Sequence, residues 1–298
     1  MSQRALNYPR LKSLALLVGL SLGSTSILIG CGGGGGGSAS TTPATTSSNV
    51  ATYTGPVSGL GSIVVNGVRF ETIGASVHDG DDPYGSHDYT SAIGLGTVVS
   101  VTGSADDANG TGSASQIRIV GGLRGTVISV DQGAGTLNLA GQTVRVGATT
   151  VFAGTLTSLA ALAGGSFVEV YGLLQADGSF AATRIEGYAT QPAGIAGVAV
   201  RGIVTTAAGG MLTLSNGLQV SYAADTVSPA GSLIAAGSDV RVLASAAPVN
   251  GQLVASRVIV LGAATLASGS ATPTAGAVVK IKGVVDSITG STLSVSGT

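Results

Sequence analysis

Short runs of apolar residues alternate with polar ones between residues 123 and 188, and this alternation predicts β-strands. Turn sequences rich in Gly, Asp and Gln, such as residues 131–135, separate the runs. Five strands are predicted, over residues 123–130, 137–139, 143–146, 167–171 and 182–185. Leu156, Leu159 and Leu162 have a spacing of three, which favours a short helix within residues 155–163. Five strands with a helix between the third and fourth is the order of an OB-like barrel.

The same pattern recurs along the chain, which indicates internal repeats. An opening glycine is assigned to Gly59, Gly125 and Gly202, and again to Gly283. Three near-complete copies are predicted, over residues 55–120, 123–188 and 199–262. The predicted fold class is therefore all-β, with tandem small OB-like five-stranded barrels joined by short turns.

Two Asn-Gly pairs predict β-hairpins. Asn66-Gly67 and Asn216-Gly217 each lie between two apolar runs. Asn-Gly is typical of a type I′ turn because both central residues of that turn need positive φ. We therefore expect a tight turn between the second and third strands of copies one and three.

The segment 58–70, which reads SGLGSIVVNGVRF, is followed by a Gly-x-Val-Val-x-Val pattern and a closing Ala/Ser-x-x-Ile pattern. Together these resemble a bacterial repeat domain of unknown function that occurs in tandem in lipoproteins of Gram-negative bacteria. The resemblance implies a small β-barrel and an envelope location. It brings no assigned activity and no catalytic residues.

The N-terminus reads as a targeting segment. Arg4, Arg10 and Lys12 precede an apolar stretch, so residues 1–30 are predicted to be a signal peptide. The sequence Leu28-Ile29-Gly30-Cys31 resembles the lipobox of bacterial lipoproteins. The resemblance implies cleavage between Gly30 and Cys31 and a diacylglyceryl group on Cys31, and Gly32 in the next position implies sorting to the outer membrane. The alternative is that Cys31 is an inert residue of a transmembrane anchor.

Segments of small and polar residues divide the rest of the chain. Residues 31–54 are Gly, Ser, Thr and Ala almost throughout and are predicted to form a flexible, lipidated tether. Residues 263–276 are predicted to be a second linker, and 277–298 the opening hairpin of a partial fourth copy. Either the sequence is truncated there, or this ribbon pairs with an exposed strand edge.

The joints between copies differ in length, which leads to an expectation about motion. Only residues 120–122 join copies one and two, whereas residues 189–198, with Pro192, join copies two and three. Because a short joint restricts two domains more than a long one, we expect copies one and two to move together and copy three to move separately.

Composition excludes several function classes. Without its signal peptide the chain keeps 14 acidic residues but loses three of its 13 basic ones, which leaves a formal charge near −4. No basic field is present to hold nucleic acid. Trp is absent and aromatic residues make up 4% of the chain, so stacking platforms for bases or sugars are scarce.

One loop, residues 78–88, could carry chemistry, because it holds both histidines of the chain among several aspartates. The candidate ligands of a divalent cation are His78, Asp79, Asp81, Asp82, His87 and Asp88. The spacing does not fit an EF-hand, because Pro83 takes the fifth position and no distal Glu follows. The interpretation we favour is a solvated acidic insertion, with no metal and no cofactor.

No catalytic motif for nucleophilic, phosphate-transfer or zinc chemistry is present, so we expect no enzyme. Glu169 and Arg184 are expected to face each other as a surface pair across a hairpin. The predicted function is a membrane-anchored envelope lipoprotein that serves as a structural or interaction module, with an unidentified envelope protein or glycan as partner. The alternative is a ligand-binding lipoprotein that takes a divalent cation at residues 78–88, or a glycan on a barrel face.

Overall fold

The computed structural model describes residues 51–81, 89–193, 196–261, 280–283, 285–289 and 292–295. Regular structure in this part of the chain is β-strand apart from three single turns of 3₁₀-helix. No helix among the described residues has the length and apolar character that crossing a membrane requires.

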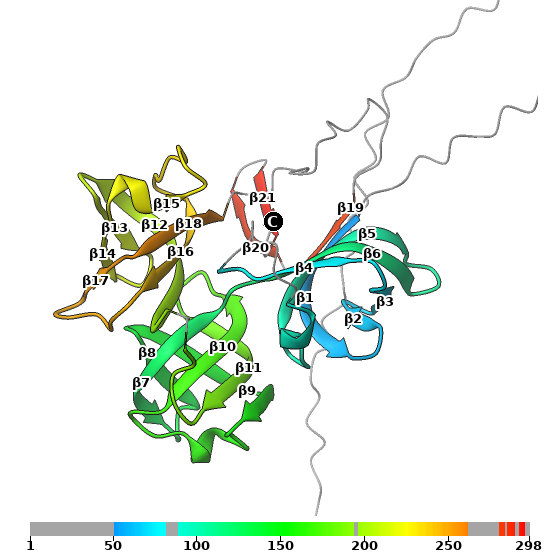
Figure 1. Cartoon of the computed structure of the whole chain (residues 1–298), viewed down its shortest axis with the longest axis horizontal. Coiled ribbons are helices and arrows are strands. Elements are labelled where there is room, and N and C mark those ends of the chain that lie inside the picture. Colours follow the sequence, from blue (N-terminus) through cyan, green and yellow to red (C-terminus); the bar gives the residue numbers. More distant parts are fainter. Residues whose placement is uncertain are drawn as a thin grey trace, which may run out of the picture. The chain divides into compact units, whose positions relative to one another are not determined.

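Copy one forms a closed five-stranded barrel (Figure 1, blue to cyan). Its elements are β1 (Ala51–Gly59), β2 (Ile63–Val65), β3 (Val68–Glu71), β4 (Ser76–His78), η1 (Thr90–Ala92), β5 (Val98–Asp106) and β6 (Thr111–Ile119). β1 pairs antiparallel with β2 and with β5, and β3 and β4 both pair parallel with β6. β6 pairs antiparallel with β5, which closes the barrel.

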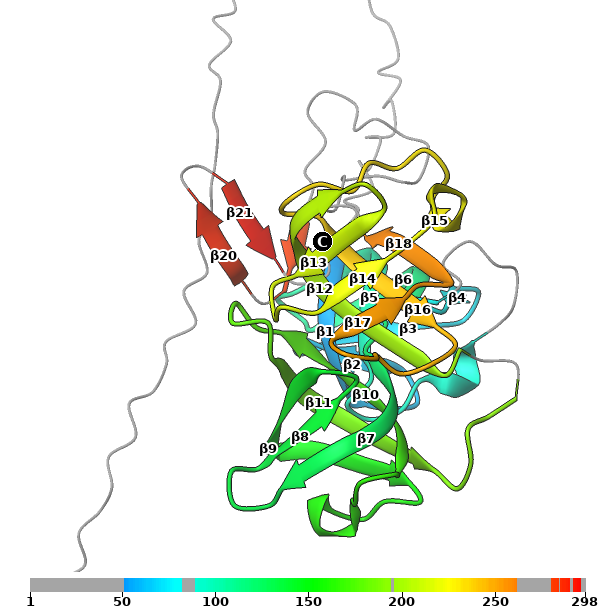
Figure 2. The ribbon, with the colours of Figure 1, turned by 90° about the vertical axis from the view of Figure 1, so that its left-hand side faces the viewer.

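Copy two repeats this topology (Figures 1 and 2, green). Its elements are β7 (Leu123–Asp131), β8 (Thr136–Leu139), β9 (Gln142–Gly154), η2 (Leu159–Ala161), β10 (Phe167–Leu174) and β11 (Phe180–Tyr188). β9 pairs parallel with β11, and β10 joins β11 back to β7.

Copy three has the same order of strands. Its third strand is split in two, as the third strand of copy one is split into β3 and β4, and its fifth strand is split as well. Its elements are β12 (Val198–Ala208), β13 (Met211–Leu214), β14 (Gln219–Ser221), η3 (Ala224–Thr226), β15 (Val227–Ser228), β16 (Asp239–Ala244), β17 (Gln252–Val254) and β18 (Arg257–Leu261). The parallel pairings are β14 with β17 and β15 with β18, and β16 closes the barrel between β12 and β18.

The tandem five-stranded barrels predicted from the alternation are thus confirmed. In each copy the first strand pairs with the second and the fourth, and the third pairs parallel with the fifth, which is the OB-like order. The alternation fits the burial: Val68 and Phe70 of β3 are buried whereas Arg69 and Glu71 are exposed.

The predicted helix within residues 155–163 is shorter than the leucine spacing suggested. It is one 3₁₀ turn, Leu159–Ala161, with Leu156 and Leu162 buried on either side of it. The equivalent η1 and η3 are also three residues long. None of the three turns contains a buried residue, so in copy two it is Leu156 and Leu162, on either side of the turn, that pack into the core.

A recurring glycine explains a difference between the copies. Gly103 of β5 and Gly172 of β10 each stand at a register shift against the fifth strand. A Cβ on either residue would collide with the backbone carbonyl of Ser113 or Ala181. Copy three has Ala244 at this position, where the fifth strand is interrupted between β17 and β18, and the ladder between β16 and β18 ends at Leu243. The glycine and the bulge therefore occur together in copies one and two.

The turns confirm one hairpin prediction and refine the other. Asn66 and Gly67 have φ values of 51° and 80°, as a type I′ turn requires. In copy three only Gly217 has positive φ, and the amide of Gly217 donates to the carbonyl of Leu214 at 2.8 Å. This is a three-residue loop with a left-handed glycine at its end.

The register of copy one corrects the sequence alignment. β1 begins at Ala51, inside the segment 31–54 assigned to the tether. Gly55 pairs with Val99 as Gly125 pairs with Val168 and Gly202 with Val240. The opening glycine of copy one is therefore Gly55 and not Gly59, and residues 51–54 belong to the barrel.

Copies two and three share one hydrophobic core, contrary to the expectation that copy three moves separately. Leu123, Leu139 and Val168 of copy two belong to the same cluster of buried side chains as Val198 and Leu218 of copy three. β7 and β12 also pair, through Arg124 and Ala199. The length of the joint is less important than the apolar surface buried across it.

A buried glutamine joins the same two copies. Gln142 has no exposed surface, and its side-chain amide donates to the carbonyl of Arg201 at 2.8 Å while its oxygen accepts from the amide of Arg201 at 3.3 Å. One side chain of copy two therefore satisfies both backbone groups of a residue in copy three.

The C-terminal segment contains three short strands (Figure 1, red). β19 (Lys280–Lys282) pairs parallel with the beginning of β1, and β20 (Val285–Thr289) forms an antiparallel hairpin with β21 (Thr292–Val295). Pairing of this ribbon with an exposed edge was one of the two predicted alternatives; β19 pairs in that way, whereas β20 and β21 pair with each other. The linker predicted at 263–276 lies outside the described residues.

Replacing Gln142 with Ala should lower the free energy of unfolding by about 1–3 kcal/mol, because it leaves two backbone groups of Arg201 buried without partners. Urea unfolding of the two chains measures the difference. Gln219→Ala is the matched control because Gln219 is exposed. Equal losses in the two variants would contradict the role assigned to Gln142.

Candidate functional site

One cross-strand position carries strongly polar residues in all three copies. The residue before the opening glycine pairs with a residue on the fourth strand: Thr54 with Ser100, Arg124 with Glu169, and Arg201 with Arg241. All three pairs are buried or nearly so. Thr54 and Ser100 are neutral, and their hydroxyls lie 3.2 Å apart. The other two pairs bring buried charges that need partners.

Asp81 of copy one supplies a carboxylate to both of the other copies. Its Oδ2 lies 2.6 Å from Arg124 Nη2 in copy two, and its Oδ1 accepts from Arg241 Nε in copy three. Arg124 and Arg241 are 3% and 1% exposed, and Asp81 is 16% exposed. One carboxylate therefore neutralises two guanidinium groups from different barrels. We call Asp81, Arg124, Glu169 and Arg241 the ionic cluster.

Glycines allow the backbones to approach at this cluster. A Cβ on Gly80 would lie 2.6 Å from the amide nitrogen of Gly121, and a Cβ on Gly121 would lie 2.6 Å from Arg241 Nη1. Arg241 also donates through Nη1 to the carbonyl of Gly122. Residue 121 must be glycine because the guanidinium of copy three lies against it, and residue 122 because a Cβ there would collide with the carbonyl of Val170.

Further contacts surround the cluster. Arg124 donates through Nη1 to Glu169 at 3.3 Å and through Nε to the carbonyl of Ala196 at 3.0 Å. The hydroxyl of Tyr188 lies 3.4 Å from Glu169 Oε2. Arg257 donates to the backbone carbonyl of Asp81 at 3.2 Å. The loop that carries Asp81 is thus held by its side chain and by its backbone.

Arg201, the other member of the Arg201–Arg241 pair, has a carboxylate of its own. Asp239 Oδ2 lies 2.6 Å from Arg201 Nη2 within copy three. The two arginines on neighbouring strands thus each have their own carboxylate partner: Asp239 for Arg201 and Asp81 for Arg241. Without Asp81, Arg241 would be a buried cation beside another cation.

The pKa values of the acidic residues in and beside the cluster are shifted in different directions. Burial favours the neutral form of Asp81, but Arg241 and Arg124 outweigh it and hold the pKa of Asp81 at about 2. Burial raises the pKa of Glu169, and Arg124 opposes this effect. Burial and repulsion from Asp81 raise the pKa of Asp79. Asp81 is therefore the member that stays ionised.

The predicted cation ligands are placed only in part. His78, Asp79 and Asp81 are described, and Asp82, His87 and Asp88 lie outside the described residues. Within the described ranges no three His, Cys, Asp or Glu side chains converge as metal ligands would. Asp81 points to two guanidinium groups, and Asp79 Oδ1 accepts from the amide of Asp81 at 3.1 Å.

The interpretation of this stretch as a solvated insertion is wrong for Asp81, which is 16% exposed and lies between guanidinium groups of the other two barrels, and Asp79 beside it is only partly exposed. The expected pair of Glu169 with Arg184 is also wrong. Leu174 pairs with Phe180, which is one residue away from the assumed symmetry, and the bulge at Gly172 adds a second residue, so Glu169 pairs with Glu186 and Arg184 with Tyr171. Glu169 instead binds Arg124, and Arg184 binds Glu186 at 2.8 Å.

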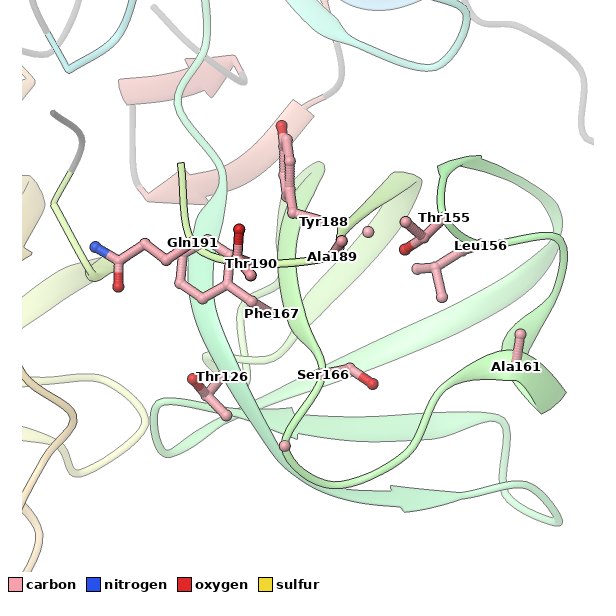
Figure 3. A pocket seen from close by; sticks show the side chains of 12 residues that line it. Thr126, Thr155, Leu156, Ala161, Ser166, Phe167, Tyr188, Ala189, Thr190 and Gln191 are labelled. Atoms are coloured by element: carbon pink, nitrogen blue, oxygen red, sulfur yellow. The ribbon is translucent and has the colours of Figure 1, made fainter. Parts of the chain in front are cut away.

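A shallow pocket of about 590 Å³ lies at one end of the copy-two barrel (Figure 3). Its wall carries Thr126, Ser166, Phe167, Tyr188 and Gln191, and none of the residues that line it is charged. Phe167 and Tyr188 meet edge to face with ring centroids 6.2 Å apart. The hydroxyl of Tyr188 connects this pocket to Glu169 of the ionic cluster.

Comparison with known proteins places these barrels in a family. The sequence profile of a domain of unknown function (DUF5666) matches residues 54–118, 124–186 and 201–259, which together are more than half of the chain. The chain belongs to the DUF5666 family. Each match begins next to an opening glycine, at Thr54, Arg124 or Arg201, in agreement with the register of the three DUF5666 barrels.

No curated protein matches the chain significantly. Among solved structures the chain is similar to one described as drosophila Unr CSD456, with 15% sequence identity and a TM-score of 0.21. That match covers 70% of this chain and 95% of the other. At this TM-score it bears on neither fold nor function.

Arg124, Arg201 and Arg241 were not predicted as site residues. A signal for Arg124 and Arg201 was present, because a basic residue stands directly before Gly125, Gly202 and Gly283. No such signal marks Arg241, which follows Val240. Gly30 and Cys31, the predicted cleavage and lipidation residues, lie outside the described part of this DUF5666 protein.

Replacing Asp81 with Asn should destabilise the protein by about 3 kcal/mol or more, because it leaves Arg241 and Arg124 buried without their shared counterion. Chemical denaturation measures the loss. Asp177→Asn is the matched control: Asp177 pairs with Arg145 at 2.8 Å, but both side chains are more than half exposed, so its loss should be much smaller. Similar losses of stability in the two variants would contradict the role of Asp81 as the counterion of Arg124 and Arg241.

The difference in stability between the native chain and Asp81→Asn should depend on pH. The pKa of Asp81 is lower in the folded protein than in the unfolded chain, so its contribution is complete above about pH 4 and is lost as the pH falls towards 2. Between about pH 6 and about pH 2.5, the difference in the free energy of unfolding between the two proteins should shrink by about 2 kcal/mol. A difference that does not change with pH would contradict an ionised Asp81.

Proposed function

We propose that this protein is a non-catalytic structural module of the cell envelope, in which three DUF5666 barrels act as one rigid block on a lipid anchor at Cys31. The ionic cluster is the observation that carries the proposal. It takes Asp81 from copy one, Arg124 and Glu169 from copy two and Arg241 from copy three, and it directs their charges at one another.

Clusters of acids and bases with shifted pKa values are often reaction centres. This cluster differs because its charged atoms are already occupied. Asp81 binds one guanidinium through each oxygen, and Arg124 uses Nη1, Nη2 and Nε on three different acceptors. Such saturation favours a role in fixing the barrels relative to one another.

The barrels have further connections of the same kind. Thr183 donates to the carbonyl of Gly96 at 2.6 Å, and Arg184 donates to the carbonyl of Leu95 at 3.2 Å, which joins copy two to copy one. Gln142 and the shared core join copy two to copy three. A block held at several points suits a spacer or scaffold better than a set of independently moving domains.

The anchoring part of the proposal is supported by the sequence. Cys31 ends a lipobox-like stretch after an apolar segment with basic residues at its start. The Gly-rich and Ser/Thr-rich segment between Cys31 and β1 has the composition of a flexible tether. Together these features fit a block held at the outer membrane of a Gram-negative bacterium, with an envelope protein as partner.

A second candidate function is binding of a neutral glycan in the copy-two pocket. The observation in its favour is a lining of hydroxyl, amide and aromatic groups without charge. Neutral oligosaccharide fragments of envelope glycans, titrated into the protein, should shift the NMR signals of Phe167 and Tyr188 if the pocket is used. Unchanged signals at saturating sugar would exclude this function.

Replacing Cys31 with Ser should abolish incorporation of labelled fatty acid and move the protein from the detergent-rich to the aqueous phase of a detergent partition, because an oxygen cannot replace the thiol in lipidation. Metabolic labelling in a Gram-negative host measures both. The matched control is Ser38→Ala in the predicted tether, which should be labelled normally. Labelling of the Cys31→Ser protein would contradict the anchor.

A further inference from the structure

The opening strand of copy one has an edge that its own barrel does not use. β5 pairs with β1 from Ala51 to Pro56 on one side. On the other side β2 pairs only with the end of β1, at Val57 and Gly59. The second edge of residues 51–53 is therefore available to another strand.

β19 lies on this edge. Ala51, Thr52 and Tyr53 pair in parallel with Lys280, Ile281 and Lys282. This is strand addition, in which backbone hydrogen bonds supply binding and side chains supply selectivity.

A side-chain cradle selects the residue at the end of β19. The ammonium of Lys282 donates to the carbonyl of Asn66 at 2.8 Å, lies 3.9 Å from Asp107 Oδ1 and stands 5.7 Å from the centre of the Tyr53 ring. The amide of Asn66 donates to the carbonyl of Lys282 at 3.3 Å. Tyr53 donates to Asp107 at 2.9 Å, which fixes the carboxylate.

The cradle recognises a feature that the opening strands share. Lys282 precedes Gly283 as Arg124 precedes Gly125 and Arg201 precedes Gly202. The opening strands of copies two and three already pair with each other, through Arg124 and Ala199. Two opening strands are left, β1 and β19. β1 has Thr54 in place of a basic residue and offers the edge, and β19 pairs with that edge.

We propose that the edge of residues 51–53, with Tyr53, Asn66 and Asp107, is a docking site for a strand that carries a basic residue before a glycine, and that its partner is β19 of a second copy of this chain. Within one molecule β19 fills the site, and between molecules the same strand links copy four of one chain to copy one of the next. Such exchange of an identical segment is domain swapping.

The contacts made by β19 make the exchange possible. The partners of Lys282 among the described residues, Tyr53, Asn66 and Asp107, all belong to copy one, so a strand from another molecule can make the same contacts. The segment 262–279, which connects β19 to copy three, can span at most about 65 Å by covalent geometry. β19 can therefore dock on any molecule that comes within this distance of copy three. The inference is independent of the lipid anchor.

Cysteine pairs test the proposal in the full-length chain with Cys31→Ser, so that the introduced thiols are the only ones. Thr52 and Ile281 are paired in register, so one variant carries Thr52→Cys and another Ile281→Cys. The two are mixed at about 1 mM, the order of the effective concentration of a linked strand, incubated and oxidised. We expect a disulfide-linked heterodimer on a non-reducing gel. Adding Lys282→Gln to the second variant should lower its yield several-fold.

Two controls make each result decisive. Ile73→Cys in place of Thr52→Cys reports random collisions, because Ile73 is 92% exposed and is not part of the edge. The double variant Thr52→Cys with Ile281→Cys, when dilute, should form a disulfide within one chain. If the mixture gives no more heterodimer than the Ile73 control, the second copy is not the partner. If the double variant also fails to form its disulfide, the docking site itself is wrong.

Discussion

The arrangement of the three barrels depends on the carboxylate of Asp81, which lies between two buried guanidinium groups. Arg124 and Arg241 are almost completely buried, and a buried cation without a counterion costs several kcal/mol. Asp81 belongs to copy one, and the two arginines belong to copies two and three. Arg241 of copy three therefore has its carboxylate partner only when the loop of copy one is in place, whereas Arg124 also has Glu169 within copy two. The joint at Gly121 must stay small for Gly80 of the loop to fit.

The cluster shows how copies of one domain acquire different roles. A single cross-strand position holds Thr54 and Ser100 in copy one, Arg124 and Glu169 in copy two, and Arg201 and Arg241 in copy three. The first pair is self-sufficient, and the third has an excess of positive charge. The negative charge comes from Asp81, in the segment that connects the third and fourth strands of copy one. The three copies thus carry complementary charges at this position and are not interchangeable.

The fold could be predicted from the sequence because its determinants are local. The alternation of apolar and polar residues predicts that Val68 and Phe70 face the interior of the barrel, and the Asn66-Gly67 pair predicts the type I′ turn that it forms. The errors arose where a determinant was not local. The pair of Glu169 with Arg184 failed because the centre of the turn lies one residue away from the assumed position and the bulge at Gly172 shifts the register by one residue more. Gly59 was taken for Gly55 because both are glycines near an apolar run, and only the pairing with Val99 distinguishes them.

The ionic cluster could not be predicted, because Asp81 and Arg241 lie 160 residues apart and nothing near either one names the other. The acidic loop looked solvated since its own neighbours in sequence are polar. The basic residue before each opening glycine was the usable signal. It is visible at Arg124, Arg201 and Lys282, and copy one, which has Thr54 at this position, is the exception.

A double-mutant cycle between Asp81 and Arg241 tests the central claim most directly. The free energies of unfolding of the native chain, Asp81→Asn, Arg241→Gln and the double variant are compared by urea denaturation. If the two side chains form a buried pair across barrels, the double variant should lose at least about 2 kcal/mol less than the two single losses combined. Losses that add to within about 0.5 kcal/mol would show that Asp81 does not hold the barrels through Arg241.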